Sequence, residues 1–187
     1  MTQTATENGL EPLRATAPWL RRWMAGDAEA HTALWRLRGE TAGKELFIGS
    51  LRGWKMRERQ GVFDQFGALL QFPRYFGGNW NAFVDCLGDL DWLRASGFLL
   101  VLMDAGDVLR DGDPDEFGLL LRLLEQTAEA FAAVTEFRPA LPFHVLLHAT
   151  PERATELEER LAAEGRALPL LESWPPAQNA RSAPSTA

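Results

Sequence analysis

Disulfide bonds are excluded within this chain of 187 residues, because Cys86 is its only cysteine. Such a composition fits a reducing compartment. Long hydrophobic runs are lacking too: the longest, residues 98–103 and 117–124, are far shorter than the roughly 20 residues that a membrane helix needs. No basic cluster followed by apolar residues opens the sequence, so no secretory signal is visible. We therefore expect a soluble, cytoplasmic protein that makes no contact with a membrane.

Motifs for common chemistry are also missing. The sequence has no Gly-x-x-x-x-Gly-Lys phosphate loop and no Gly-x-Ser-x-Gly nucleophile elbow. The aspartates of residues 104–115 lack the central glycine and closing glutamate of an EF-hand calcium loop. Of the histidines, His31, His144 and His148, the last two flank a predicted strand, which would place them about 13 Å apart, too far to share a metal ion. We expect no catalytic residues, no metal site and no cofactor, and thus no enzyme.

Basic residues are outnumbered, 19 against 26 acidic ones, and the formal net charge is −7. The imbalance is concentrated in residues 79–116, which contain nine acidic and two basic side chains. A nucleic-acid-binding protein shows the opposite bias, so direct binding of nucleic acid is not expected. An acidic segment of this kind attracts a cationic partner. The alternative is an ordinary solvated acidic face.

The hydrophobic pattern alternates between strands and helices. Strands are expected at residues 45–51, 98–103 and 143–147. Residues 98–103 are a continuous apolar run, typical of a strand buried on both faces, and residues 143–147, introduced by Pro142, are expected to be buried as well. Helical spacing marks residues 57–71, 80–90 and 114–135, the last opening at Pro114 with Asp113 as its cap. Strands alternating with helices indicate an α/β fold with a small, mainly parallel sheet.

Three regions follow from this pattern. Residues 1–44 are expected to form a partly ordered N-terminal extension, with a short helix followed by a strand at residues 33–37. Residues 45–150 form the main domain. Residues 151–187 comprise a terminal helix, at 151–165, and a disordered tail rich in proline, serine and alanine. The pattern leaves open whether the first strand belongs to the main domain.

The most informative segment is residues 72–90, FPRYFGGNWNAFVDCLGDL. Asn79 is a good N-cap for the helix that follows. On a helical wheel the buried face comprises Trp80, Phe83, Leu87 and Leu90, with Cys86 beside them. The opposite, exposed face comprises Asn81, Val84, Asp85, Gly88 and Asp89. Together with Tyr75 and the two glycines of the loop, this face is rich in hydrogen-bond acceptors and suits a cationic groove on a partner. An ordinary amphipathic helix after a glycine loop would show the same wheel, so the pattern alone does not decide between a binding surface and a plain solvated helix.

This segment resembles the loop and second helix of the barstar family. The pattern is apolar–Pro–x–Tyr–aromatic–Gly–x–Asn–x–(Asp/Asn)–Ala–apolar–x–Asp–Cys–Leu, and the order of elements agrees over about residues 45–149. It is filled here by Phe72, Pro73, Tyr75, Phe76, Gly77, Asn79, Asn81, Ala82, Phe83, Asp85, Cys86 and Leu87. The resemblance implies a small three-stranded parallel sheet packed with helices.

It further implies an intracellular inhibitor of a basic ribonuclease, either barnase-like or a ribonuclease toxin. In the family this loop and helix enter the ribonuclease active site and mimic the phosphates of RNA. Asp85 would then be the central carboxylate, placed for charge-assisted contacts with the cations that hold phosphate. The other expected contacts are Tyr75, Gly77, Asn79, Asn81, Val84 and Glu125.

Three departures from the family pattern bear on the partner. The family has a second aspartate at the position of Asn81 and a tryptophan at the position of Val84. A later acidic contact falls near Glu125, although Gln126 aligns equally well. The alternative hypothesis is therefore a binding module of the same fold for another basic protein.

Overall fold

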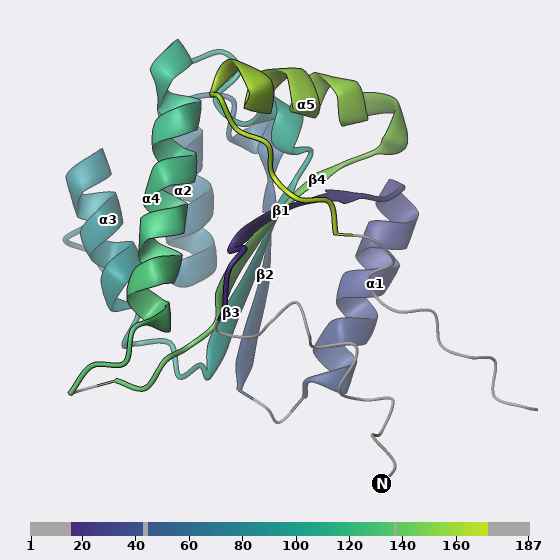
Figure 1. Cartoon of the computed structure of the whole chain (residues 1–187). Coiled ribbons are helices and arrows are strands. Elements are labelled where there is room, and N and C mark those ends of the chain that lie inside the picture. The colour runs from purple at the N-terminus through teal and green to yellow at the C-terminus, as the bar shows by residue number, and fades with distance from the viewer. Residues whose placement is uncertain (1–15, 43–44, 137, 172–187) are drawn as a thin grey trace, which may run out of the picture.

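The computed structural model describes residues 16–42, 45–136 and 138–171. Their strands form a wholly parallel sheet in the order β1-β4-β3-β2 (Figure 1). The strands are β1 (Leu20–Met24), β2 (Leu46–Arg52), β3 (Gly97–Met103) and β4 (Phe143–Ala149). Every residue of β3 and β4 is buried, as expected for strands covered on both faces, and β3 is the continuous apolar run that such strands show. The α/β class with a parallel sheet is confirmed.

The expected number of strands, three, is wrong, because the sheet has four. The additional strand is β1, which pairs with β4 from Leu20 opposite Val145 to Met24 opposite Ala149. Only Leu20 and Trp23 of β1 are buried, and two arginines lie between them. The segment therefore lacks the strict alternation that marks a strand in a sequence. Part of the N-terminal extension thus belongs to the main sheet.

The strand expected at residues 33–37 is also wrong, since this segment lies inside α1 (Asp27–Glu40). The buried positions of α1 are Ala30, Ala33, Leu34 and Leu37, spaced three and four residues apart as in an amphipathic helix. A window of five residues is too short to reveal that period. The helix covers the face of the sheet opposite to the other long helices (Figure 1).

The remaining helices agree closely with the expected ones. On the other face lie α2 (Arg59–Leu70), α3 (Trp80–Asp89) and α4 (Pro114–Ala132) (Figure 1). After β4, the expected helix of residues 151–165 is present as α5 (Ala154–Ala163), preceded by the 3-10 helix η4 (Pro151–Arg153). Two further 3-10 helices follow strands: η2 (Gly53–Lys55) and η3 (Ala105–Asp107).

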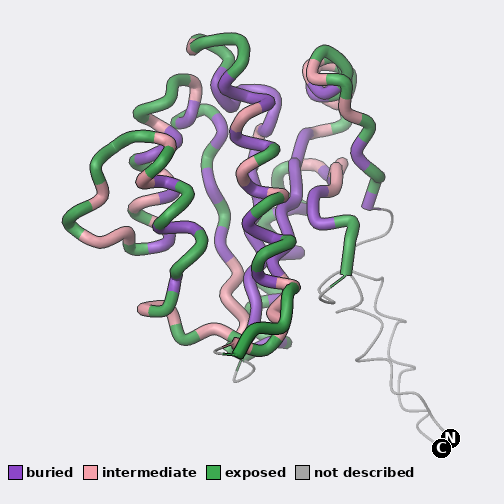
Figure 2. Tube along the Cα trace, turned by 60° about the vertical axis from the view of Figure 1, so that its left-hand side comes forward, coloured by how far each residue is buried: buried purple, intermediate pink, exposed green. Residues whose placement is uncertain are grey.

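The sheet separates two hydrophobic clusters. The larger lies under α2, α3 and α4, and the smaller is formed largely by α1 and the opposite side chains of β3 and β4. Figure 2 shows this buried interior between exposed helix surfaces. No helix of the described ranges is both long and apolar enough to span a bilayer. The expected disordered tail, residues 173–187, lies outside the described residues.

A close backbone approach at the ends of β2 and β3 yields a testable prediction. A Cβ at Gly53 would lie 2.2 Å from the Asp104 carbonyl oxygen and 2.5 Å from that of Met103. Because backbone cannot move aside cheaply, we expect Gly53→Ala to lower the free energy of unfolding by about 2 kcal/mol or more. Gly39→Ala is the control, because nothing lies within 4 Å of its Cβ in α1 and helical alanine is favoured over glycine. Urea denaturation measures both, and equal effects would contradict the prediction.

Candidate partner-binding surface

The loop before α3 is built by short local hydrogen bonds. The Phe76 amide donates to the Pro73 carbonyl at 2.9 Å, which closes a turn after α2. Gly78 takes a positive φ of 62°, which favours glycine there. The Asn79 side-chain oxygen then accepts from the Ala82 amide at 3.0 Å, so the predicted N-cap is confirmed. The loop therefore has a defined shape where it enters the helix.

Aromatic packing fixes this loop to the core. The Phe76 ring lies 5.6 Å from that of Phe63 on α2 and 5.1 Å from that of Phe72. Trp80, the first residue of α3, lies 5.0 Å from Phe63 and 5.5 Å from Phe83, both edge-on. Edge-to-face pairs of this kind stabilise beyond the area that they bury. The main chain between Phe72 and Trp80 is thereby held at both ends.

The two faces of α3 are those that the helical wheel predicts. Phe83, Cys86 and Leu87 are buried, while Trp80 is half-buried. The exposed residues of the helix are Asn81, Val84, Asp85, Gly88 and Asp89. In the preceding loop, Tyr75 is 77% exposed, so a large aromatic ring stands in solvent next to this helix. We call Tyr75, Gly77, Asn79, Asn81, Val84 and Asp85 the loop–helix surface.

The acidic side chains of residues 79–116 differ in whether they form ion pairs, as six of the nine illustrate. Asp104, Asp107, Asp111 and Glu116 form ion pairs with arginines, so much of their charge is neutralised internally. Asp85 and Asp89 are exposed and form no ion pair with any described residue. The free negative charge of α3 is therefore presented to solvent, and that of Asp85 lies on the loop–helix surface.

A hydrogen bond orients this surface against α4. The Trp80 indole Nε1 donates to Glu116 Oε1 at 3.1 Å, and the same oxygen pairs with Arg59 Nη1 at 3.2 Å. Three helices, α2, α3 and α4, are thus joined at one carboxylate. Sequence reasoning missed Glu116, because no spacing within one element links a tryptophan to a glutamate 36 residues later.

Glu125 stands apart from the other expected contacts. Its carboxylate accepts from Arg166 Nη1 at 2.9 Å, in the segment after α5. Glu125 lies nine residues after Glu116 on α4, which places the two side chains on roughly opposite sides of the helix. Glu116 is on the side that contacts α3, so Glu125 is not. The structure brings six of the seven expected residues to one loop and helix, and it engages the seventh with Arg166.

Cys86 behaves as a core residue and not as a nucleophile. It is 4% exposed, and burial raises the pKa of its thiol, with the charges of Asp85 and Asp89 adding to that effect. A raised pKa keeps the sulfur protonated at neutral pH and therefore weakly reactive. His144 and His148 are buried as well, at 2% and 0% exposure.

These features define a class: an α/β protein whose parallel sheet carries helices on both faces, with a shaped acidic loop and helix at one side. The chain belongs to the barstar family. Residues 47–148, more than half of the chain, match the family model described as Barstar (barnase inhibitor). The strand β1 and the helices α1 and α5 lie outside that match.

No curated protein matches the chain. Among solved structures it is similar to one described as the Aeropyrum pernix ORC2 protein in its ADP form, with a TM-score of 0.55 and 11% identity. The match covers 89% of this chain and 45% of the other, so the chain spans less than half of that protein. At this identity the likeness concerns the fold alone.

Proposed function

We propose that this protein is an inhibitor of a basic ribonuclease, acting inside the producing cell. The loop–helix surface enters the active site of the ribonuclease, and the Asp85 carboxylate takes the place of an RNA phosphate. The observation that carries the proposal is the combination of barstar family membership with an exposed carboxylate at the motif position of Asp85 that forms no ion pair with any described residue. The protein binds and does no chemistry itself.

The shape of the loop supports this proposal. Because the Asn79 cap and the aromatic contacts of Phe76 and Trp80 hold the backbone before any partner arrives, little conformational freedom is lost on binding. Tyr75 contributes a rigid, exposed aromatic ring, a type of side chain enriched where binding energy is concentrated.

The charge distribution supports it as well. Among the described residues Asp85 has no ion pair that would have to break before it meets arginines or a histidine of a ribonuclease. Glu125 is the weakest of the proposed contacts, since its carboxylate would first have to break its ion pair with Arg166. Asn81 and Val84 make the surface less charged and smaller than the family pattern, and they select the partner.

Inhibition of RNA cleavage by a panel of small basic ribonucleases tests the proposal. We expect stoichiometric inhibition of at least one member, stronger at low salt because charged surfaces steer the encounter. A second, acidic ribonuclease serves as control and is expected to be unaffected. If no basic ribonuclease is inhibited while another basic protein binds the same surface, the alternative of a barstar-fold binding module is correct.

A further inference from the structure

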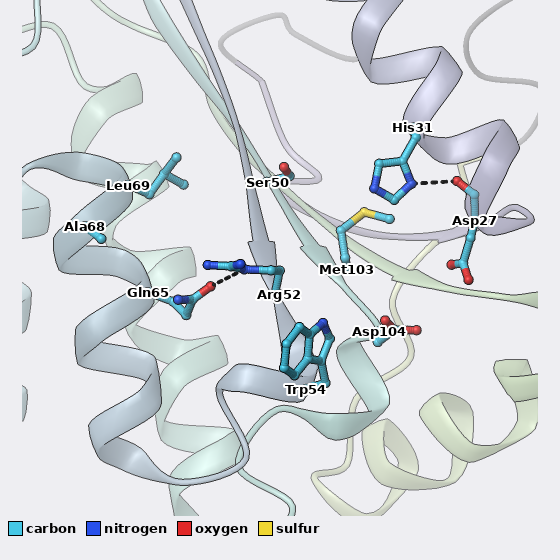
Figure 3. Close-up of a pocket in the computed structure, with 10 residues that line it drawn as sticks. All are labelled: Asp27, His31, Ser50, Arg52, Trp54, Gln65, Ala68, Leu69, Met103 and Asp104. Carbon is cyan, nitrogen blue, oxygen red and sulfur yellow. Dashed lines mark hydrogen bonds between the residues drawn. The ribbon is translucent and has the colours of Figure 1, made fainter.

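A pocket of about 600 Å³ lies at the carboxyl ends of β2, the edge strand, and β3, between α1 on one face of the sheet and α2 on the other. Asp27 and His31 of α1 and Asp104 beyond β3 line it, together with Ser50, Arg52 and Met103 (Figure 3). Ligands of open parallel sheets bind outside the carboxyl ends of the strands, so the pocket occupies the place where this architecture builds sites. The loop–helix surface shares none of these residues.

Two carboxylates and a buried imidazole converge at the edge of this pocket. One ligand atom from each of Asp27, Asp104 and His148 lies within 4.8 Å of the other two. The three come from separate strand ends: Asp27 follows β1, Asp104 follows β3, and His148 is the penultimate residue of β4. Figure 3 shows the Asp27 and Asp104 carboxylates on the same side of the pocket.

The hydrogen bonding of His148 leaves one of its ring nitrogens available to bind a metal. Its Nε2 lies 2.9 Å from the Ala25 carbonyl oxygen, which can only accept, so Nε2 carries the proton. The lone pair is therefore on Nδ1, which is buried and has no hydrogen-bond partner among the described residues. The side chain as a whole is 0% exposed. A buried acceptor left without a partner is costly, whereas a metal-bound histidine typically donates its other N–H to a carbonyl in this way.

We propose that Asp27, Asp104 and His148 bind one divalent ion of the first transition series, with Zn²⁺ as the test ion. Two oxygens and one imidazole nitrogen suit Zn²⁺ or Mn²⁺, while Mg²⁺ and Ca²⁺ prefer oxygen ligands alone. Three protein ligands leave at least one coordination position open towards the pocket, as at sites where a metal holds water or a small anion.

The surrounding charges permit this ion. Arg153 Nη1 lies 3.5 Å from Asp104 Oδ1 and is the one cation paired with either carboxylate in the described part of the chain. Its nearer contacts are with Asp107 at 2.9 Å and Glu156 at 3.0 Å, so it remains paired when Asp104 turns to a metal. Arg52, which also lines the pocket, donates a hydrogen bond from Nε to Gln65 Oε1 at 3.1 Å.

The three ligands connect the N-terminal segment, which lies outside the family match, with residues inside that match. Asp104 and His148 lie within the matched residues 47–148, but Asp27 lies outside them. A bound ion would link the first turn of α1 to the ends of β3 and β4. On sequence alone, His144 with His148 and the aspartates of residues 104–115 are the metal ligands considered and no metal site is expected, because residues 27, 104 and 148 show no ligand spacing along the chain.

Calorimetric titration of the tag-free full chain with Zn²⁺ at neutral pH tests the proposal, using Asp27→Asn and the control Glu29→Gln. Both side chains are exposed acids of the first turn of α1, so both variants lose the same charge and the same interaction with the helix dipole. We expect wild type and Glu29→Gln to bind one ion, and Asp27→Asn to bind at least about tenfold more weakly than Glu29→Gln. A smaller difference, or no binding by wild type, overturns the site.

Nitrogen-15 NMR of the histidine rings provides a second measurement. Zn²⁺ is expected to shift the Nδ1 resonance of His148 and to leave His144 unchanged. A shift at His31 in place of His148 overturns the ligand set, because His31 lines the same pocket from the exposed side of α1.

Discussion

Asp85→Ala is expected to weaken the complex with the inhibited ribonuclease by at least about 30-fold, which corresponds to about 2 kcal/mol. Truncating one partner of a charge pair that is desolvated at an interface leaves the opposite charges buried without a partner. In the free protein Asp85 is exposed, and it forms no ion pair with the described residues. The fold should therefore tolerate the change. The dissociation rate, measured by surface plasmon resonance, is expected to carry most of the loss.

Two variants separate this effect from general loss of charge. Asp85→Asn keeps the size of the side chain and removes its charge, so we expect it to weaken the complex nearly as much as alanine does. Glu159→Ala removes a carboxylate from an exposed position of α5, a helix that lies away from α3 (Figure 1). We expect it to change the association rate slightly and the dissociation rate not at all. Equal losses for Asp85→Ala and Glu159→Ala would rule out Asp85 as the central contact.

The loop and α3 could be predicted from the sequence because their signals are local. An N-cap, a proline that ends α2 and a helical wheel all act over a few residues, and Asn79 caps α3 as expected. β1 could not be predicted in the same way. Its assignment depends on pairing with β4, about 125 residues later, while its own sequence places Arg21 and Arg22 between two buried residues.

The acidic segment shows a second limit. Composition counts nine acids in residues 79–116, but it does not distinguish those that are paired from those that are free. Asp107 is 7% exposed and surrounded by arginines, whereas Asp85 faces solvent. The pairing depends on Arg57 and Arg153, which lie on either side of the segment in sequence and meet only in the fold. Of these acids, some hold the structure together and others remain available to a partner.

Asp107→Ala is expected to lower the free energy of unfolding by about 2–3 kcal/mol at neutral pH, because it removes charge-assisted hydrogen bonds at a buried carboxylate, while Arg153 keeps Glu156 and Arg57 keeps Asp111 as partners. Arg153 donates to both carboxylate oxygens of Asp107, at 3.1 and 2.9 Å, and Arg57 Nη1 lies 3.3 Å away. Denaturant unfolding measures the change. Asp111→Ala is the matched control: Asp111 binds the same Arg57 but is exposed, so a much smaller loss is expected.

The pH dependence gives the same prediction a second test. Hydrogen bonds from Arg153 hold the pKa of Asp107 below its usual value, and they outweigh burial, which acts in the opposite direction. A carboxyl whose pKa is lower in the folded state stabilises the fold above its unfolded pKa, about 3.9, and loses that contribution as the pH falls through the folded pKa. The difference between wild type and Asp107→Ala should therefore be constant above about pH 5 and shrink below about pH 4. A difference that stays the same down to strongly acidic pH would show that packing around residue 107, and not its charge, stabilises this end of the sheet.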